Sequence, residues 1–454
     1  MSLKITISGV RGIVGESLTE DFIRSFISSY IKYSGCKKIA VGTDTRLSRK
    51  FVADIVLDEL FLNNVGVAWL GIAPTPTVQV VTKELGLDGG IVITASHNPS
   101  QWNGLKFIRK DGIFLNEKEA GDLIRLYEER KKTPPALRPK KAGVALFYED
   151  KERARSIHLE KIIRNVDSAA IKAKKFKVAL DPGNGAGSVI TKELLTLLGC
   201  EIISINDDTE KEFQRGPEPV PENLKALEKI VAACKADIGF AQDPDADRLS
   251  IVSDKGIAIG EEYSLALCAA HMFEKKKKGR SLCATANLST SRMIDDIAKK
   301  FGAAVFRTKV GEVNVSEKIK EKNCIIGGEG NGGVIFPEVG LGRDSLSGIA
   351  LILEYMALTG KKISELAAEI PGYIMVKDKM EMQENKIAGF IERVKERFAG
   401  ERSDMTDGLK IDFADGWVHV RPSNTEPVVR FIAEGKNRGS VEKTIGQIRG
   451  LSKA

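Results

Sequence analysis

A serine and a histidine stand side by side where an apolar run of the chain ends. Ser96 and His97 belong to the segment 94–99, T-A-S-H-N-P, which directly follows the apolar residues 90–93, G-I-V-I. Ligands of α/β sheets bind at the carboxyl ends of strands, and an Asn-Pro pair favours a turn, so the serine hydroxyl is predicted to stand in a loop at such an edge. The G-x-S-x-G elbow of hydrolases is absent. The pair is therefore either a nucleophile of another kind or an ordinary turn.

Three carboxylates alternate with other residues in the segment 243–248, D-P-D-A-D-R, between the apolar runs 238–241 and 249–252. The spacing of two predicts that all three point to one side of an extended segment. A hard divalent cation would relieve their mutual repulsion, and Mg²⁺ suits a phosphate partner better than Ca²⁺. Pro244 and Arg248 argue against an EF-hand loop. A solvated acidic turn is the remaining alternative.

Two further loops carry groups suited to a sugar phosphate. The segment 327–333, G-G-E-G-N-G-G, offers Glu329 and Asn331 as hydrogen-bond partners for sugar hydroxyls, although a hairpin tip would explain its glycines equally well. The segment 421–427, R-P-S-N-T-E-P, combines with Arg430 to supply guanidinium, hydroxyl and amide donors. Those donors could grip a phosphate dianion or cap a turn.

The elements that must position these loops are strand-length apolar segments alternating with helix-length amphipathic ones, a pattern typical of α/β domains. Breaks near residues 133–150, after Asp254 and at Pro371-Gly372 divide the chain. The predicted domains are 1–150, 151–252, 253–370 and 371–454. The Gly-rich segment 181–187 between a strand and a helix is interpreted as a tight structural turn, because its spacing departs from G-x-G-x-x-G.

Composition excludes several classes of protein. The chain has 454 residues, of which 42% are hydrophobic and 29% charged, so it must fold into several domains and is neither disordered nor fibrous. The net charge of +7 is spread out, and the basic run 275–278 is interpreted as a solvated helix end, so no nucleic-acid partner is expected. Six scattered cysteines predict reduced thiols and no zinc site. No apolar run approaches ~18 residues, so a cytoplasmic protein without membrane spans is expected.

Taken together, the four loops resemble those of the α-D-phosphohexomutase family in order and spacing over nearly the whole chain. The resemblance implies three related α/β domains with mixed sheets and a smaller α+β C-terminal domain around a central cleft. It implies that Ser96 carries a phosphoryl group and that Mg²⁺ is held by this serine with Asp243, Asp245 and Asp247. The residues matched to roles around the reacting phosphate are Arg11, His97, Lys106 and Arg248. Those matched to substrate binding are Lys309, Glu329, Asn331, Arg421, Ser423, Asn424, Thr425 and Arg430.

The resemblance implies transfer of phosphate between the 6- and 1-positions of a hexose through a hexose 1,6-bisphosphate, which is both intermediate and activator. Lys106 could take the sugar proton only if burial or nearby cations lower its pKa. Sugar phosphates are the expected partners of a monomer or homodimer. A bisphosphate synthase or phosphatase and a non-catalytic phosphosugar sensor are the alternatives, and the intact Ser96, metal carboxylates and phosphate loop argue against the sensor.

The choice of sugar rests on small differences in the loops. Asn331, Gly332 and Gly333 stand where related loops end in Ser-Gly-His. The segment 308–311, T-K-V-G, and the R-P-S-x-T-E-P form of the phosphate loop resemble phosphoglucosamine mutases. The E-x-N-G-G loop is also similar to archaeal-type enzymes described as phosphomannomutase or phosphoglucomutase. Glucosamine phosphate is narrowly favoured as substrate.

Overall fold

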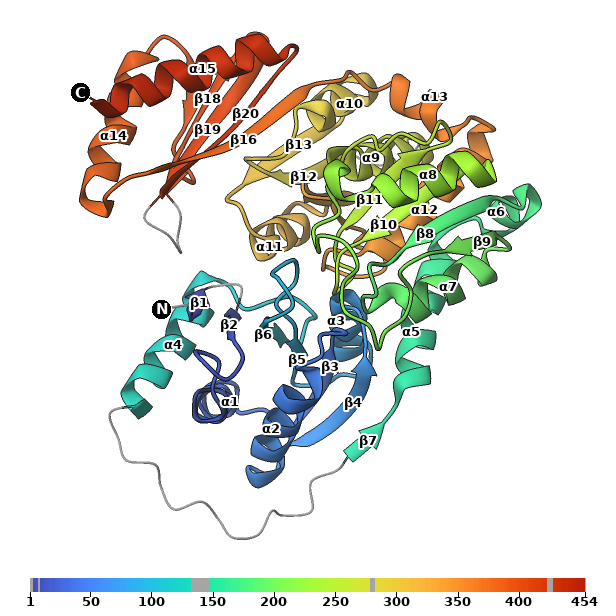
Figure 1. Cartoon of the computed structure of the whole chain (residues 1–454), viewed down its shortest axis with the longest axis vertical. Helices are drawn as coiled ribbons and strands as arrows, with labels where there is room; N and C mark the ends of the chain where they lie inside the picture. The colour runs from blue at the N-terminus through green and yellow to red at the C-terminus, as the bar shows by residue number, and fades with distance from the viewer. Residues whose placement is uncertain (1–2, 7–8, 132–146, 278–281, 423–427, 454) are drawn as a thin grey trace.

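The computed structural model of the chain describes residues 3–6, 9–131, 147–277, 282–422 and 428–453. These residues form four units that follow one another along an arc, from the blue N-terminal unit to the red C-terminal one (Figure 1). Each unit is built on its own sheet. Within the described residues, no helix combines the length and apolar content needed to cross a membrane.

The first unit contains a mixed sheet with the strand order β1-β2-β6-β5-β3-β4-β7. Its strands are β1 (Lys4–Thr6), β2 (Gly9–Ile13), β3 (Lys38–Thr43), β4 (Gly66–Ile72), β5 (Gly89–Ile93), β6 (Trp102–Arg109) and β7 (Phe147–Glu149). Its helices are α1 (Glu20–Ser34), α2 (Arg49–Leu62), α3 (Thr75–Glu84) and α4 (Glu117–Lys131). Val41 packs in one apolar cluster with α1 and α2, whereas Ala40 packs in another with α3. Because successive strand side chains point to opposite faces, helices cover both sides of the sheet.

The second and third units share one continuous apolar core. The second consists of α5 (Lys151–Asn165), α6 (Ser168–Lys174), β8 (Lys177–Asp181), α7 (Gly187–Leu197), β9 (Glu201–Ser204), α8 (Lys225–Cys234), β10 (Ile238–Gln242) and β11 (Leu249–Ser253). The third consists of α9 (Glu262–Lys276), β12 (Cys283–Asn287), α10 (Met293–Phe301), β13 (Ala304–Thr308), α11 (Glu312–Lys322), β14 (Ile326–Glu329), β15 (Gly333–Ile335), α12 (Ser345–Thr359) and α13 (Ile363–Ala368).

One strand arrangement recurs in the first three units. The orders β4-β3-β5-β6, β9-β8-β10-β11 and β13-β12-β14-β15 each place three parallel strands beside one antiparallel strand. In each unit, a predicted functional loop lies between the third parallel strand and its antiparallel neighbour: the Ser96 loop, the aspartate loop and the glycine-rich loop. The prediction of three related α/β domains with mixed sheets is confirmed.

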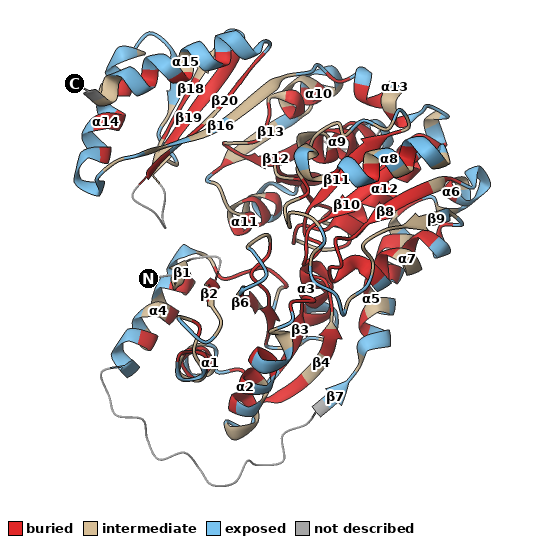
Figure 2. Ribbon diagram, viewed as in Figure 1, coloured by how far each residue is buried: buried red, intermediate tan, exposed pale blue. Residues whose placement is uncertain are grey.

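The fourth unit is smaller and antiparallel, with the order β16-β20-β19-β18-β17. Its strands are β16 (Ile374–Glu381), β17 (Arg402–Asp404), β18 (Leu409–Phe413), β19 (Gly416–Pro422) and β20 (Val428–Gly435), and its helices are α14 (Glu384–Arg397) and α15 (Arg438–Gly450). The helices bury their apolar residues against the central strands and expose the opposite faces (Figure 2). This unit is the α+β domain that the sequence predicts.

Two cysteines correct the prediction of six reduced thiols. Cys283 begins β12 and Cys324 stands just before β14, and the structure joins them in a disulfide with a Cα–Cα distance of 4.8 Å. The parallel pairing of β12 with β14 brings these strand starts together across 41 residues of sequence, which no spacing rule indicates. Cys36, Cys200, Cys234 and Cys268 are free.

Alkylation tests this pairing directly. We expect iodoacetamide to label four of the six cysteines in unfolded, unreduced protein and all six after reduction. The double variant Cys283→Ser/Cys324→Ser should lose about 2–4 kcal/mol of unfolding free energy, because the bond closes a long loop in the unfolded chain. Six labelled cysteines without reduction would contradict the pairing.

The basic run at the end of α9 also differs from its interpretation. Lys275 and Lys276 end the helix as expected, but Lys275 Nζ lies 2.7 Å from Oε1 of the buried Glu354 on α12. His271 contacts the other oxygen of the same carboxylate, 2.6 Å away. Lys275 therefore compensates a buried charge and is not merely solvated, while Lys278 lies outside the described residues.

Candidate functional site

A cleft with a volume of about 530 Å³ is lined by residues from all four units. The first and second units contribute Arg11, His97, Asn98, Lys106 and Arg248, among others. The third and fourth contribute Glu312, Glu329, Asn331, Arg343, Arg421 and Arg430. Loops far apart in the sequence therefore face one space, as the predicted central cleft requires.

The loop that carries Ser96 is held in a strained turn. Ser96 has a φ of 50°, a left-handed conformation that non-glycine residues rarely adopt, and it is almost fully buried. Its backbone N–H donates to Thr94 Oγ1 over 2.8 Å. Its hydroxyl lies 3.3 Å from Asp243 Oδ2 and 3.3 Å from His97 Nδ1. The turn thus aims the serine at the aspartate loop of the second unit, and strain of this kind is common at functional sites.

Arg46 fixes this turn, although nothing in the sequence singles it out. Its guanidinium donates to the backbone carbonyls of Ser96, Asn98, Pro99 and Trp102. Its Nε donates to Asp44 Oδ2 over 3.0 Å, and Thr94 Oγ1 donates to the same oxygen over 2.6 Å. One buried arginine therefore binds three carbonyls of the Ser96 loop and that of Trp102, the first residue of β6.

We expect Arg46→Lys to fold but to lose activity. A lysine retains the charge beside Asp44, but its ammonium cannot reach four carbonyls in the fork geometry of a guanidinium. Misplacement of the serine should lower kcat roughly 10- to 100-fold. Arg49→Lys is the matched control, because Arg49 forms an exposed pair with Glu210 at 2.7 Å. Equal kcat values for the two variants would contradict the role of Arg46.

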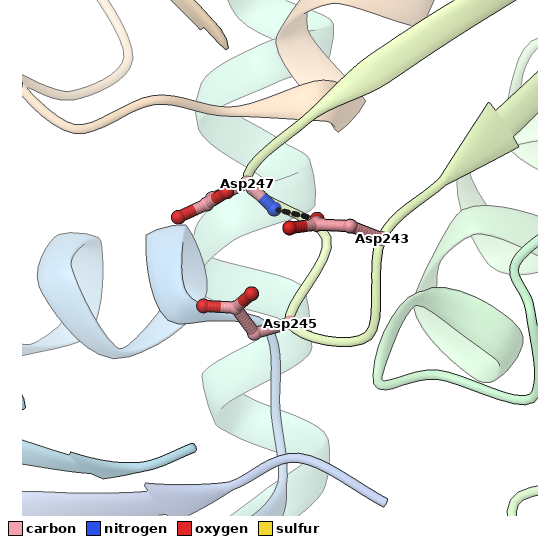
Figure 3. Close-up of side chains that lie close together, drawn as sticks. All are labelled: Asp243, Asp245 and Asp247. Carbon is pink, nitrogen blue, oxygen red and sulfur yellow. Dashed lines mark hydrogen bonds between the residues drawn. The ribbon is translucent and has the colours of Figure 1, made fainter. Parts of the chain in front are cut away.

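The three aspartates converge in a loop between β10 and β11 (Figure 3). One carboxylate oxygen from each lies within 4.8 Å of the others, and all three residues are buried. The expected extended segment is wrong: Ala246 has a φ of 53°, and Asp243 Oδ1 accepts the backbone N–H groups of Asp247 and Arg248. A tight turn therefore brings the carboxylates together.

The Gly-rich segment 181–187 packs against this turn. A Cβ added at Gly185 would lie 2.8 Å from Pro244 O, so the close approach requires a glycine. This contact supports the interpretation of the segment as a tight structural turn.

The oxygens left without partners fit a hard cation. Asp245 Oδ1 and Asp247 Oδ1 are buried and have no hydrogen-bond partner among the described residues. Burial, followed by the charges of Asp247 and Asp245, raises the pKa of Asp243 well above its ordinary value. Unpartnered buried carboxylate oxygens beside mutually repelling acids are costly unless a cation binds them. The residues present therefore fit Mg²⁺.

Several basic side chains lie close to these carboxylates. Lys106 Nζ lies 2.6 Å from Asp245 Oδ2 and 3.2 Å from Asp247 Oδ2. Burial lowers the pKa of Lys106, but the two aspartates raise it more, so it lies above its ordinary value and the lysine is protonated. The lowered pKa that a proton-accepting lysine requires is therefore not found beside these two carboxylates. Arg11 donates to Asn98 Oδ1 over 2.9 Å.

His97 is uncharged in this setting. Arg248 lies 3.0 Å from its Nδ1, and the charge of Arg248, then burial, then Arg11 lower the pKa of His97 well below its ordinary value. Arg248 also forms an ion pair with Glu218 at 2.5 Å. The ring nitrogen facing Arg248 therefore accepts a hydrogen bond.

The two polar residues of the glycine-rich loop, Glu329 and Asn331, differ in whether their side-chain oxygens have hydrogen-bond partners. Glu329 is buried, and its carboxylate accepts from Asn287 Nδ2 at 2.7 Å, Gly311 N at 2.9 Å and Arg343 Nη1 at 2.9 Å. Asn331 lines the cleft, and its Oδ1 is buried without a hydrogen-bond partner among the described residues. Lys309 lies half-exposed and pairs with Glu117 at 3.4 Å. It is not among the residues that line the cleft.

Arg421 and Arg430 stand opposite each other on neighbouring strands β19 and β20 and both line the cleft. Like charges directly opposite in a sheet repel each other unless an anion binds between them. Asp407 lies 3.7 Å from Arg421 Nε and accepts the Val310 N–H of the third unit over 2.9 Å. Ser423, Asn424 and Thr425 lie outside the described residues.

Two buried, charged residues of the cleft were not predicted from the sequence. Arg343 stands just before α12, and Glu312 begins α11. Arg343 Nε lies 3.0 Å from Glu312 Oε2, and Arg343 Nη2 lies 2.6 Å from Asp247 Oδ2. Neither residue belongs to a spaced motif, so their contacts with each other and with Asp247 are evident only in the folded chain.

Comparison with known families accounts for the four units. The models described as phosphoglucomutase/phosphomannomutase alpha/beta/alpha domains I, II and III match residues 3–134, 156–256 and 261–373, and the C-terminal domain model matches residues 375–451. The chain belongs to this family. Phosphohexomutases of this family are phosphotransferases of the isomerase class, and the chain is an enzyme of that class.

Relatives in the phosphohexomutase family cover nearly the whole chain. A phosphoglucomutase/phosphomannomutase of Thermococcus kodakarensis is 40% identical over 94% of this chain and 94% of its own length. A phosphoglucosamine/phosphogalactosamine mutase of Sulfurisphaera tokodaii is 32% identical over 97% of each chain. These names differ in the sugar.

Solved structures show the same phosphohexomutase fold. A phosphoglucomutase/phosphomannomutase family protein from Burkholderia thailandensis superposes with a TM-score of 0.82 at 24% identity, over 99% of this chain and 98% of that chain. An N-acetylphosphoglucosamine mutase of Aspergillus fumigatus, solved with GlcNAc-6P and magnesium, superposes with a TM-score of 0.63 at 14% identity, over 100% and 96% of the two chains.

Proposed function

We propose that the enzyme interconverts hexose 6-phosphates and hexose 1-phosphates through a phosphorylated Ser96 and a hexose 1,6-bisphosphate. The observation that carries this proposal is the position of the Ser96 hydroxyl, 3.3 Å from Asp243 Oδ2 at the junction of the first two units. A serine needs no strong base there, because phosphoryl transfer depends mainly on positioning and charge neutralisation. Both are available around Ser96.

Each group around Ser96 has a distinct task in this mechanism. Ser96 with Asp243, Asp245 and Asp247 would hold Mg²⁺, which would neutralise charge on the transferring phosphoryl oxygens when bound. Arg11 and Arg248 add fixed positive charge on the cleft side. Lys106 contacts Asp245 and Asp247 and lines the cleft that would receive the sugar. His97 offers a neutral ring beside the serine.

The two transfers balance without any other reactant. In the first, the bond between phosphorus and Ser96 Oγ breaks, a new bond forms to the free sugar hydroxyl, and the proton of that hydroxyl ends on Ser96 Oγ. In the second, the bisphosphate has turned round, and Ser96 Oγ takes the other phosphoryl group while its proton ends on the released sugar oxygen. The phosphate not being transferred would bind to Arg421 and Arg430, with Ser423, Asn424 and Thr425 as the further predicted contacts.

Glucosamine phosphate is the proposed substrate. The T-K-V-G segment with Lys309 and the phosphate loop support it, as does the name of the Sulfurisphaera relative. Glucose and mannose phosphates are the second candidates, because the Thermococcus relative at 40% identity carries those names. Glu329 and Asn331 are the residues proposed to meet the sugar hydroxyls in either case.

One assay separates these activities. Pure protein with Mg²⁺ and a trace of glucose 1,6-bisphosphate is incubated in turn with glucosamine, glucose and mannose 6-phosphates, and kcat/KM is compared. We expect 1-phosphate products without net release of inorganic phosphate, and the highest kcat/KM for glucosamine 6-phosphate. Inorganic phosphate as the main product would indicate a phosphatase. Accumulated bisphosphate would indicate a synthase, and a higher kcat/KM for glucose or mannose would reverse the sugar assignment.

A further inference from the structure

Arg343 contacts three carboxylates that come from three separate segments of the cleft. Its Nη2 lies 2.6 Å from Asp247 of the aspartate loop, its Nη1 2.9 Å from Glu329 of the glycine-rich loop, and its Nε 3.0 Å from Glu312 on α11. All four residues are buried. One guanidinium thus bonds to the proposed metal loop and to the proposed sugar loop at the same time.

The chemistry of the contacts requires an arginine. A guanidinium presents donors in a rigid planar fork that can meet several carboxylates in fixed directions, whereas the ammonium of a lysine is a compact point charge on a flexible stem. Carboxylates of this kind, buried close together, need both a counter-charge and hydrogen bonds. Arg343 supplies both to Asp247, Glu329 and Glu312.

The backbone beneath Arg343 is firmly held. Asp344 accepts the Leu346 N–H and so caps α12, and its own N–H donates to Val334 O over 2.7 Å. His158 of α5 lies 3.0 Å from Asp344 Oδ2. The guanidinium therefore projects from an anchored position, which suits a residue that sets the positions of others.

Arg343 also fills space that a side chain at position 333 would need. A Cβ added at Gly333 would lie 2.2 Å from Arg343 Cδ and 2.9 Å from Arg343 Cγ. The side chain of Arg343 can therefore occupy this position only because residue 333 is a glycine.

We propose that Arg343 is a positioning residue that fixes the metal loop and the sugar loop relative to each other, in the space left by Gly333. This proposal rests on the proposed function, which assigns Mg²⁺ to the aspartate loop and the sugar to the glycine-rich loop. Through Asp247 the residue acts on metal binding, and through Glu329 it acts on sugar recognition. A purely structural arginine would affect stability without affecting both ligands.

The test uses variants that keep the positive charge and disturb only its geometry. In Arg343→Lys, the fork is lost; in Gly333→Ala, the native arginine is pushed aside by the new methyl group. For each variant we expect the calorimetric Kd for Mg²⁺ to rise about 10-fold or more, the size typical of lost outer contacts to metal ligands. We expect the KM for glucosamine 6-phosphate to rise about 10-fold as well, in a protein that remains folded.

Matched controls separate positioning from stability. Arg109→Lys disturbs an arginine that also meets three carboxylates, those of Asp111, Glu119 and Glu317, but does not line the cleft. Gly446→Ala adds a methyl group where nothing lies within 4 Å. Both controls should leave the Kd and the KM within about twofold of wild type, even where Arg109→Lys lowers the melting temperature.

The outcomes distinguish the two proposals. If wild type shows mutase activity while Arg343→Lys and Gly333→Ala change neither the Kd for Mg²⁺ nor the KM, the role of Arg343 is wrong and the proposed function stands. If only the Kd for Mg²⁺ or only the KM changes, Arg343 does not position both loops and the proposal is also wrong. If wild type neither binds nor converts any of the three hexose phosphates, the proposed function fails, and the sugar half of this inference fails with it.

Discussion

The variant Ser96→Ala should retain sugar-phosphate binding and lose turnover. Its kcat should fall by at least roughly 10³-fold, as when an enzyme loses the group that forms its covalent intermediate. The Kd for glucosamine 6-phosphate should stay within about threefold of wild type. The change removes one small side chain, and Arg46 continues to hold the carbonyl groups of the loop. Steady-state kinetics and calorimetric binding measure the two quantities.

Ser100→Ala is the matched control for this variant. Ser100 is exposed in the same loop, four residues further on, and takes no part in the proposed chemistry. Wild-type kcat is expected for it. If Ser96→Ala turned over at the wild-type rate, the assignment of Ser96 as the phosphate carrier would be wrong. If it lost substrate binding as well, the loop would matter for structure more than for chemistry.

The second large effect concerns the aspartate loop. In Asp245→Asn, the Mg²⁺ concentration for half-maximal activity should rise at least about tenfold, and kcat at saturating Mg²⁺ should fall roughly 100-fold. An amide is a weaker metal ligand than a carboxylate. The substitution also removes the negative charge that lies 2.6 Å from Lys106 Nζ. A titration of activity against Mg²⁺ at fixed hexose phosphate gives both values.

Asp181→Asn provides the comparison for this variant. Asp181 is equally buried at the end of β8, but its carboxylate pairs with Arg215 at 3.0 Å and lies outside the aspartate triad. It should lose stability and keep the wild-type Mg²⁺ titration. An Asp245→Asn titration that matched wild type would remove Asp245 from the proposed metal site.

The sequence was most informative where function and secondary structure share a short segment. The apolar runs before Ser96, Asp243 and Glu329 predict strands, and the following loops lie at equivalent places in three sheets. Each loop joins a parallel strand to its antiparallel neighbour, so the same chain topology brings all three to one cleft. Local patterns were enough to find them because strand, turn and reactive residue are adjacent in the chain.

Residues that act through distant contacts were beyond such reasoning. Arg46 lies 50 residues from the Ser96 carbonyl that it binds, and Arg343 lies 96 residues from Asp247. Neither has a neighbour in sequence that marks it. The turn at Ala246 was missed for a related reason: alternate spacing predicts a shared side only for an extended chain, and the left-handed φ here achieves convergence by folding back.

The pKa of Lys106 differs from the sequence-based expectation because of the carboxylates beside it. The sequence suggested Lys106 as an acid–base group on the condition of a lowered pKa, but Asp245 and Asp247 outweigh burial and raise the pKa of the lysine. Its contacts with both carboxylates make the lysine their counter-ion. A bound divalent cation would share the aspartates' charge, so metal binding and the lysine's proton are linked through the same two carboxylates.

The central claim is that Ser96 holds a phosphoryl group transiently during turnover. The most direct measurement is phosphopeptide mass spectrometry of enzyme quenched during steady turnover with Mg²⁺, glucose 1,6-bisphosphate and the preferred hexose phosphate. We predict one phosphoryl group on the peptide that contains Ser96, lost when excess hexose 6-phosphate is added without bisphosphate. Active enzyme whose Ser96 never carries phosphate under these conditions would contradict the account.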